Sequence, residues 1–437
     1  MARAFDQIDQ FVVVMMENRS FDHMLGYWGL PPWSGERAAQ PADGVRLDHV
    51  CPAPDGSPRR PFAFTAEELG LIDHDLPHDR RSIWGQLNRD AADPSRFHMD
   101  GFVRQTFPAG PVPDRVPCLG YLTPPLVPVT HFLSTEFTIC DRWFSPIPTE
   151  THPNRMMSLA GWTPYDQTPG QLVDASPTVV DFLRGRGVDL RIYARRVSFL
   201  ALATSTVVHA REVLHPWASF EADWNQPVTG PRVVYAEPAY RDAGPIVAQP
   251  PAEDDHPPTP VVYGQSFLRE VYRIVRGNDE RWRRTLMIIT YDEHGGFADH
   301  VPPPTLETPA PAQGLYPRFV CAGPRVPALL VSPWVDRLGT CKLVLDHTSI
   351  LRTLAEKFAP GNQRVFRNAD GGAADCVFRR PVSSLWPALT RDAPRDDNPP
   401  PPPAPALPPQ PVSAPSPGTA AARMAVDAVL AALGVLP

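Results

Sequence analysis

Three short hydrophobic runs predict buried β-strands in this chain. They are Phe-Val-Val-Val-Met-Met at 11–16, Leu-Met-Ile-Ile-Thr at 286–290 and Val-Pro-Ala-Leu-Leu-Val-Ser at 326–332. The runs are short, rich in branched aliphatic residues and followed by polar residues. This pattern is typical of parallel strands covered on both faces. We therefore expect all three runs to be parallel strands of one sheet.

Helices are predicted between and after these runs. In residues 263–276, apolar positions recur at the spacing of one helical face, and they are Phe267, Leu268, Val271, Ile274 and Val275. Residues 347–358 show a similar pattern, with Thr348 or Ser349 available as the N-cap. Strands that alternate with helices favour the α/β class, with a mostly parallel central sheet and helices on both faces.

Two regions lack this periodicity. Residues 30–128 are rich in Pro, Asp and His, and we interpret them as a large excursion from the core and not as a separate domain. Residues 391–418 contain five consecutive prolines at 399–403 and predict a polyproline-type linker or tail. We therefore expect one domain over 1–390, the linker or tail over 391–418, and a short C-terminal helix over 419–437.

Composition narrows the class of protein. Proline accounts for 57 of 437 residues, which excludes an all-helical bundle, and the net charge of -7 gives no basic field for nucleic acid. The six cysteines show no zinc-site spacing, so we expect free buried thiols. The first residues do not resemble a signal peptide, and no run is long enough to span a membrane. We expect a cytoplasmic protein, with export by another route left open.

Acidic and amide side chains follow two of the predicted strands. Glu17 and Asn18 come directly after the first run, and Asp292 and Glu293 come shortly after the second. The carboxyl ends of parallel strands share one edge of the sheet, so these groups should lie together. Three clustered carboxylates would repel one another unless a cation joined them, and a hard divalent ion suits oxygen ligands. The alternative is an acidic surface loop after each strand.

A hydroxyl group stands before a predicted helix in the segment Thr-Glu-Thr-His-Pro-Asn-Arg at 149–155. Thr151 would face the positive end of the helix, where anions bind and where metal contact could make an alkoxide nucleophile reachable. Arg155 could clamp a non-transferred phosphoryl oxygen. The alternative is that Thr151 is only an N-cap, with Pro153 in the first turn.

Together these segments resemble the phosphoesterase family that includes non-specific phospholipase C and a group of acid phosphatases. The likeness spans roughly residues 8–360 and lies nearest the phospholipase C branch. The matching segments are ENRSFDHMLGYW at 17–28, CDRWFSPIPTETHPNR at 140–155, PAEDDHP at 251–257, ITYDEHGGFADHVPPP at 289–304, RVPALLVSPWV at 325–335 and DHTSILRTL at 346–354.

The resemblance implies an alkaline-phosphatase-like α/β/α sandwich for the catalytic domain at 1–390. It also implies a divalent metal ion, with Ca, Mg, Mn and Zn all open. The expected ligands are Glu17, Asn18, Asp292, Glu293 and Thr151.

The resemblance further implies that Thr151 is the nucleophile. His256 and His78 match histidines at the phosphate site, where either could stabilise the phosphoryl oxygens or protonate the leaving alcohol, and Arg155 completes the catalytic set. The residues expected to bind substrate are Asn154, Asp255 and His294. Three features depart from the family pattern: His152 after the nucleophile, the absence of a signal peptide, and the Pro-rich tail.

The function expected from the resemblance is phospholipase C cleavage of glycerophospholipids through a phosphothreonine intermediate. Peripheral membrane contact would accompany it, and the aromatic and aliphatic residues that could contact lipid, or else pack in the core, are Trp28, Leu30, Trp33, Trp143 and Phe144. An acid phosphatase acting on soluble monoesters is the alternative, although Thr at 151 in place of Ser weighs against it. An inactive relative that binds lipid or a partner remains a third reading. A sulfatase is a distant fourth reading. It is kept because the spacing of Thr151, Pro153 and Arg155 mimics that of a sulfatase motif, although a sulfatase would need Cys or Ser at the first position.

Overall fold

The computed structural model describes residues 2–168, 177–241, 251–308, 318–366 and 376–407. The predicted C-terminal helix at 419–437 lies outside these residues, as does the part of the Pro-rich segment after 407. The structure is built on an eight-stranded sheet with the order β14-β6-β13-β10-β1-β9-β7-β8. These strands span, in that order, Gly339–Cys341, Thr138–Cys140, Ala328–Val331, Thr285–Tyr291, Gln10–Met16, Arg232–Glu237, Asp189–Ala194 and Leu214–Pro216.

The sheet is mostly parallel. β10, β1, β9, β7 and β8 pair in parallel along the sheet, and every residue of β1 and of β10 is buried. β13 is antiparallel to both of its neighbours, β10 and β6. The expectation that 326–332 forms a parallel strand is therefore wrong, because a buried apolar run gives a strand no direction. Since β13 reverses the direction once on each side, β6 and β14 run the same way as β10.

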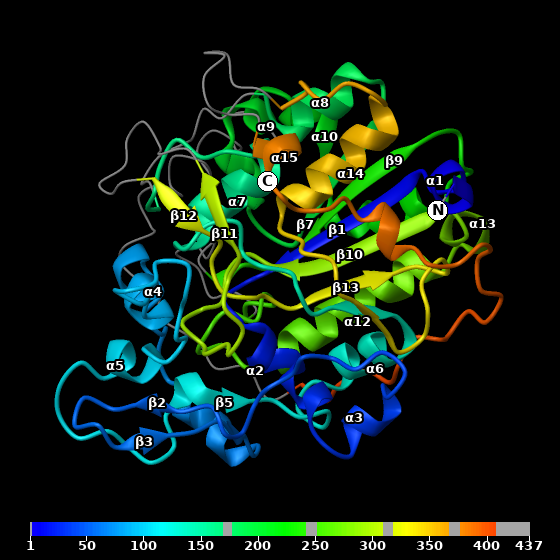
Figure 1. Ribbon diagram of the computed structural model, residues 1–437. Coiled ribbons are helices and arrows are strands. Elements are labelled where there is room, and N and C mark those ends of the chain that lie inside the picture. Colours follow the sequence, from blue (N-terminus) through cyan, green and yellow to red (C-terminus); the bar gives the residue numbers. More distant parts are fainter. Residues whose placement is uncertain (1, 169–176, 242–250, 309–317, 367–375, 408–437) are drawn as a thin grey trace.

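Helices cover both faces of the sheet (Figure 1). α7 (Thr151–Ala160), α8 (Val179–Gly185) and α14 (Thr348–Phe358) pack together on one face, and α6 (Pro128–Glu136) and α12 (Val262–Arg276) pack together on the other. The helices predicted at 263–276 and 347–358 are thus confirmed, although the first amides of α14 are capped by Asp346 and not by Thr348 or Ser349. This three-layer arrangement confirms the predicted α/β/α class.

Shorter helices complete the two layers and the loops. They are α1 (Ala2–Gln7), α2 (Phe21–Leu25), α3 (Trp33–Glu36), α4 (Arg80–Leu87), α5 (Phe102–Thr106), α9 (Thr204–Val208), α10 (Ala210–Val213), α11 (Phe220–Trp224), α13 (Asp279–Trp282) and α15 (Cys376–Arg379). Outside the central sheet, β11 (Thr305–Thr308) pairs with β12 (Phe319–Cys321). None of the described helices is long and apolar enough to cross a membrane.

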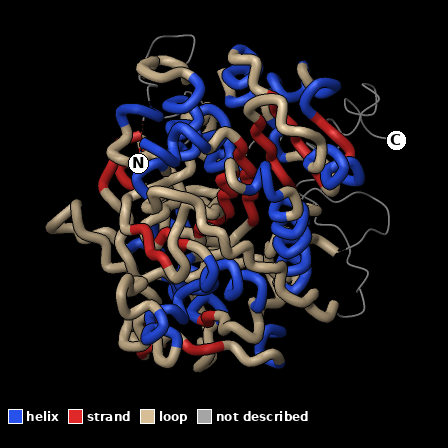
Figure 2. Tube along the Cα trace, turned by 90° about the vertical axis from the view of Figure 1, so that its right-hand side faces the viewer, coloured by secondary structure: helices blue, strands red, loops and turns tan. Residues whose placement is uncertain are grey.

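The excursion at 30–128 consists of loops with short elements. Its strands are β2 (Cys51–Pro52), β3 (Pro58–Arg59), β4 (Phe62–Ala63) and β5 (Gly120–Tyr121). The excursion occupies the lower part of Figure 1, and Figure 2 shows loops prevailing there while the strands of the central sheet gather above. The five cysteines whose side chains are described are free and buried, as expected.

The described part of the Pro-rich segment lies against the domain and runs along α12. Three side chains of α12 donate hydrogen bonds to its backbone carbonyl groups: Arg269 to Pro402 at 2.6 Å, Tyr272 to Pro399 at 2.7 Å and Arg276 to Asn398 at 3.1 Å. A polyproline segment keeps its carbonyl groups free for such donors, because it forms no internal hydrogen bonds. Residues 398–402 therefore form a docked strap.

Arg395 fastens the start of this strap, and its removal should destabilise the fold. Its buried side chain donates to the Glu136 carbonyl at 2.5 Å and pairs with Asp397 at 2.8 Å. We expect Arg395→Ala to lower the free energy of unfolding by about 1.5–3 kcal/mol, the range for hydrogen bonds of charged groups. Urea denaturation measures this. Arg391→Ala, which removes a more exposed pair with Asp336, should cost less than about 1 kcal/mol; equal losses would contradict the assignment.

Candidate active site

The candidate site forms where four chain segments leave parallel strands at one edge of the sheet. Glu17 and Asn18 follow β1, and Asp292 and Glu293 follow β10. The segment after β6 leads to Thr151, and the segment after β9 leads to His256. Because these four strands run in the same direction, their carboxyl ends meet at that edge. The sheet topology therefore brings together residues that are far apart in sequence.

The two polar pairs after β1 and β10 are in direct contact. The backbone N–H of Asn18 donates to Asp292 Oδ1 at 3.1 Å. All four side chains of the two pairs are fully buried. Asn18 has a φ of +57°, in the left-handed region that few non-glycine residues adopt. Gly295 makes the contact possible, because a Cβ there would lie 2.1 Å from the Asn18 carbonyl oxygen. Strained backbone of this kind is typical of functional sites.

Arg155 forms ion pairs with two of the acidic side chains, Glu17 and Asp292. It lies one turn after Thr151 on α7, is 3% exposed, and pairs with Glu17 and Asp292 at 3.3 Å each. Its third nitrogen donates to the Tyr240 hydroxyl at 3.0 Å. The sequence led us to expect a clamp on a phosphoryl oxygen. The structure instead favours a positioning role, because all three guanidinium nitrogens donate to protein acceptors.

Two histidines flank the Asn18 side chain. The Asn18 Nδ2 lies 3.1 Å from His256 Nε2 and 3.4 Å from His78 Nε2. The Nδ1 of each ring lies 2.7 Å from a backbone carbonyl, so this nitrogen carries the proton and the ring is held in place. Burial alone would lower the pKa of His78, but Glu293 and Asp75 reverse the shift and raise it to about 10. The structure thus places two imidazoles beside the acidic groups: a cationic one, His78, and that of His256.

The acidic groups fit a divalent cation. Asn18 Oδ1 and Glu293 Oε1 are buried and lack a hydrogen-bond partner in the described part of the chain. Burial raises the pKa of Asp292 to about 6, while His78 keeps the pKa of Glu293 below its ordinary value despite burial. Unpartnered buried oxygens are costly, and a hard cation is a partner that oxygen ligands of this kind accept. The predicted ligands are therefore suited to the ion.

Thr151 is the first residue of α7, and its side chain is 8% exposed. Glu150 occupies the N-cap position without a side-chain cap hydrogen bond, so the alternative reading of Thr151 as an N-cap is wrong. Thr151 and Arg155 are four residues apart on one helix face. Because Arg155 contacts Glu17 and Asp292, this spacing carries Thr151 to the same edge of the sheet.

The three residues expected to bind substrate are buried and engaged with the protein. Asn154 is bonded to the backbone of 147–150 and shapes the loop before Thr151. Asp255 accepts the Tyr291 hydroxyl at 2.5 Å, and burial raises its pKa to about 7. His294 lies 2.8 Å from Gln86 and 3.3 Å from Glu293. These contacts favour supporting roles over direct contact with substrate.

The aromatic residues expected at a lipid-facing rim are mostly in the core. Trp28, Trp143 and Phe144 are buried, so the alternative reading of core packing holds for them. Leu30 and Trp33 are partly buried and pack against the core. The large apolar side chains that are exposed in the described chain are Leu47, Leu71, Trp84, Val208, Val344 and Leu407.

A second acidic cluster, which sequence reasoning did not identify, lies beside the first. Ligand atoms of Asp22, Asp299 and His300 lie within 4.8 Å of one another, a spacing that could hold a metal ion. Arg325 is fully buried there and donates to Asp22 at 2.9 Å and to Asp299 at 2.8 Å. Since this guanidinium already balances both carboxylates, we interpret the cluster as an ion-pair network that joins the loops after β1 and β10.

His300 should make stability depend on pH. It lies 2.7 Å from Asp22 and 3.1 Å from Asp43, and although burial lowers the pKa of His300, Asp22 raises it to about 9. The folded state therefore holds a proton that the unfolded state releases above about pH 6.5. Between about pH 6.5 and 9 the wild type should lose up to about 3 kcal/mol of stability, present in full only below that window. Urea denaturation across this range should show a larger loss in wild type than in His300→Asn, because His78, whose pKa is also raised, contributes to both curves; parallel curves would contradict it.

Sequence reasoning missed two residues behind the site. Glu237 is the last residue of β9, and Tyr240 follows it. We did not predict this strand, although 232–237 reads Arg-Val-Val-Tyr-Ala-Glu. His347, which precedes α14, lies 2.7 Å from the Asp292 carbonyl oxygen, and burial lowers its pKa to about 4. The apolar character of 233–236 was the available signal for β9.

Comparison with known proteins places this geometry in context. Non-specific phospholipase C3 of Arabidopsis thaliana is 31% identical over 401 residues, which cover 85% of this chain and 74% of the relative. Non-hemolytic phospholipase C of Burkholderia pseudomallei is 27% identical over 401 residues, covering 80% of this chain and 55% of the relative. Among solved structures, a protein of the alkaline phosphatase superfamily from Vibrio parahaemolyticus is similar with a TM-score of 0.33 and 11% identity, covering 53% of this chain and 60% of that one.

The sequence also matches the model of one protein family, described as the Phosphoesterase family, over residues 8–359. This range includes every strand of the central sheet and every residue of the candidate site. The chain belongs to the Phosphoesterase family.

Proposed function

We propose that this phosphoric ester hydrolase is a phospholipase C, which cleaves glycerophospholipids to diacylglycerol and a phosphorylated head group. The observation that carries the proposal is that the two acidic pairs and the two histidines meet at one edge of the sheet, where Arg155, one turn after Thr151 on α7, contacts Glu17 and Asp292. The likeness to non-specific phospholipase C over 85% of the chain supports the diester as substrate.

The residues that would hold a divalent ion are Glu17, Asn18, Asp292 and Glu293, together with Thr151. When bound, the ion would supply positive charge to phosphoryl oxygens and lower the pKa of the threonine hydroxyl. Arg155 would keep Glu17 and Asp292 in place. Asn18 would be fixed by its backbone contact with Asp292 and by the contact of its side-chain nitrogen with His256.

The reaction would proceed in two displacements. Thr151 Oγ attacks phosphorus as its proton passes to His256 or His78, and the bond from phosphorus to the glycerol oxygen breaks, giving phosphothreonine and diacylglycerol. His256 or His78 donates the proton that the glycerol oxygen needs, and the other stabilises the phosphoryl oxygens. Water then attacks phosphorus and gives a proton to the same histidine. The bond to Thr151 Oγ breaks, the histidine returns the proton to Thr151 Oγ, and the phosphorylated head group leaves.

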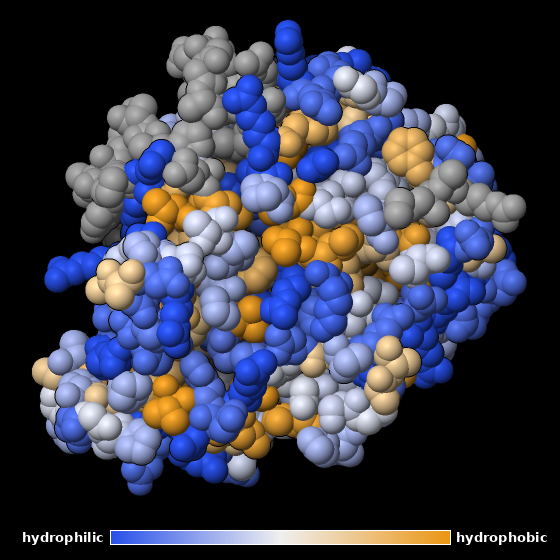
Figure 3. Space-filling model, in the orientation of Figure 1, coloured by the Kyte–Doolittle hydropathy of each residue, from blue (hydrophilic) through white to orange (hydrophobic). Residues whose placement is uncertain are grey.

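The excursion that carries His78 also carries exposed apolar side chains that could contact lipid. Leu71 and Trp84 are each 40% exposed and lie before and after His78 in the sequence of the excursion. On the face shown in Figure 3, hydrophilic residues prevail around the margin, and apolar residues gather toward the centre. Exposed apolar residues beside a polar site suit a substrate with acyl chains.

Leaving-group selectivity tests the proposal. The purified protein should release diacylglycerol from phosphatidylcholine micelles with a kcat/KM well above that for p-nitrophenyl phosphate or p-nitrophenyl sulfate. Turnover of the monoester alone would favour the acid phosphatase alternative, and turnover of the sulfate ester alone would favour a sulfatase. No turnover of any of the three with added divalent metal would support an inactive relative.

A further inference from the structure

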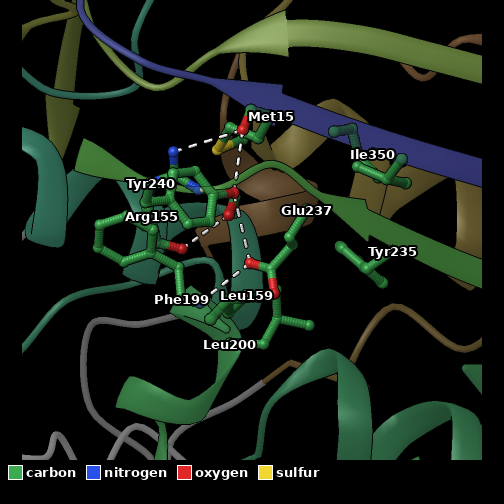
Figure 4. A pocket seen from close by; sticks show the side chains of 11 residues that line it. Met15, Arg155, Leu159, Phe199, Leu200, Tyr235, Glu237, Tyr240 and Ile350 are labelled. Atoms are coloured by element: carbon green, nitrogen blue, oxygen red, sulfur yellow. Dashed lines mark hydrogen bonds between the residues drawn. The ribbon is translucent and has the colours of Figure 1, made fainter. Parts of the chain in front are cut away.

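A narrow pocket lies behind Arg155, between the sheet and the helices α7 and α14 (Figure 4). Its walls are largely apolar and include Val13 of β1, Leu159 of α7 and Ile350 of α14. One carboxylic acid stands in this apolar lining, Glu237 at the end of β9, and its side chain is buried. A buried acid in such surroundings is costly and needs an explanation.

Glu237 makes two contacts that lead toward the active site. Its Oε1 accepts the backbone N–H of Phe199 at 3.0 Å and lies 3.4 Å from the hydroxyl of Tyr240, whose one proton it shares with the Met15 carbonyl oxygen. Tyr240 is fully buried, and its hydroxyl also lies 3.1 Å from the Met15 carbonyl oxygen. The acid therefore holds both the ring of Phe199, through its backbone, and the hydroxyl of Tyr240.

Phe199 and Tyr240 both contact the Arg155 guanidinium. Its central carbon lies 4.1 Å from the centre of the Phe199 ring and 4.6 Å from that of the Tyr240 ring, so two aromatic groups surround it. The Tyr240 hydroxyl accepts a hydrogen bond from Arg155 at 3.0 Å. On its other side the guanidinium pairs with Glu17 and Asp292 at 3.3 Å. A contact path thus runs from Glu237 to the predicted cation ligands.

We propose that Glu237 is a positioning residue of the active site, which acts through Tyr240 and Phe199 to hold Arg155 against Glu17 and Asp292. The carboxyl group acts as a hydrogen-bond acceptor for two donors and touches no reacting atom. Partners that lie behind ligating carboxylates commonly tune metal affinity and activity by about 10–100-fold.

The role requires an acceptor and does not require a full negative charge. Burial raises the pKa of Glu237 to about 7, and the Ser198 hydroxyl and Arg155 oppose the shift. The ionisable side chains near it are Arg155, Tyr235 and Tyr240. A glutamine side chain, which keeps an acceptor oxygen in the same place, should therefore preserve the function, whereas leucine should not.

A double-mutant cycle between Glu237 and Tyr240 tests the path. Glu237→Leu and Tyr240→Phe should each lower kcat for phosphate-ester hydrolysis by about tenfold with KM changed less than about twofold, and the double variant should be no worse than either single one. Glu237→Gln should stay near wild type. Glu270→Gln, at a partly buried acid on α12 that pairs with Arg195, is the matched control.

Calorimetric titration with Mn²⁺ gives a readout that needs no substrate. The affinity for Mn²⁺ should fall about tenfold in Glu237→Leu and in Tyr240→Phe, and should be unchanged in the control. Additive losses in the cycle, or Mn²⁺ affinity equal to wild type in folded Tyr240→Phe, would overturn the proposal. If Glu237→Leu does not fold, Tyr240→Phe and Glu237→Gln decide the question. The activity arm rests on the proposed function, but the titration does not, so the two failures can be told apart.

Discussion

Thr151→Ala should lose about four to six orders of magnitude in kcat for phosphodiester hydrolysis. Removal of a nucleophile ends the covalent route and leaves only the catalysis that binding and charge supply, and losses of this size are typical. The side chain stands at the first position of α7, where unpaired backbone N–H groups favour the negative charge of an alkoxide or phosphate. Steady-state release of diacylglycerol by the variant measures the effect.

Two variants separate the loss of a nucleophile from general damage. Thr151→Ser keeps a hydroxyl at the same place and should retain activity within about tenfold of wild type. Thr135→Ala removes a threonine hydroxyl on α6 that donates to the His131 carbonyl, and it should leave kcat unchanged. A Thr151→Ala protein that is folded and loses less than tenfold would exclude the hydroxyl as nucleophile.

Glu293→Gln should lower the affinity for a divalent cation by at least about 100-fold and reduce hydrolysis in parallel. The substitution keeps the shape of the side chain and an acceptor for the Gly295 N–H, now 2.8 Å from Oε2. It removes the negative charge of the carboxylate. The other oxygen of that carboxylate, Oε1, is buried without a hydrogen bond in the described part of the chain. A hard cation binds an amide oxygen more weakly than a carboxylate, so affinity should fall before stability does.

Titration of the metal-free protein with Mn²⁺, followed by calorimetry, gives this affinity directly. Glu356→Gln is a suitable control, because Glu356 pairs with Arg352 along α14 and has no contact with the site. Equal Mn²⁺ affinity in wild type and Glu293→Gln would show that the ion, if bound, lies elsewhere, and the Asp22, Asp299 and His300 cluster would be the next place to examine.

The part of the site that follows the strands could be predicted from the sequence. The runs at 11–16 and 286–290 are adjacent parallel strands in register, Met16 opposite Tyr291, so the residues after them had to meet. The contact of Asn18 with Asp292 follows from that register. The run at 326–332 was equally apolar, yet its strand is antiparallel, because burial on both faces does not determine direction.

Side-chain direction is the part that could not be predicted. Arg155 follows Thr151 by one turn, and the sequence does not show that its guanidinium turns inward to Glu17 and Asp292 and not outward to substrate. The aromatic residues Trp28 and Trp143 looked equally suited to a lipid surface and to the core, and only the packing decides for the core. Tyr240 and Glu237 belong to no sequence motif that we recognised. Their role depends on where the Arg155 side chain lies, which the sequence does not show.

The measurement that tests the central claim most directly is a rapid acid quench during turnover of phosphatidylcholine, followed by mass spectrometry of the peptides. The account predicts a phosphoryl group on Thr151 in the wild type and none in Thr151→Ala. Sustained hydrolysis with no phosphoryl group on Thr151, or with the group on another residue, would contradict it.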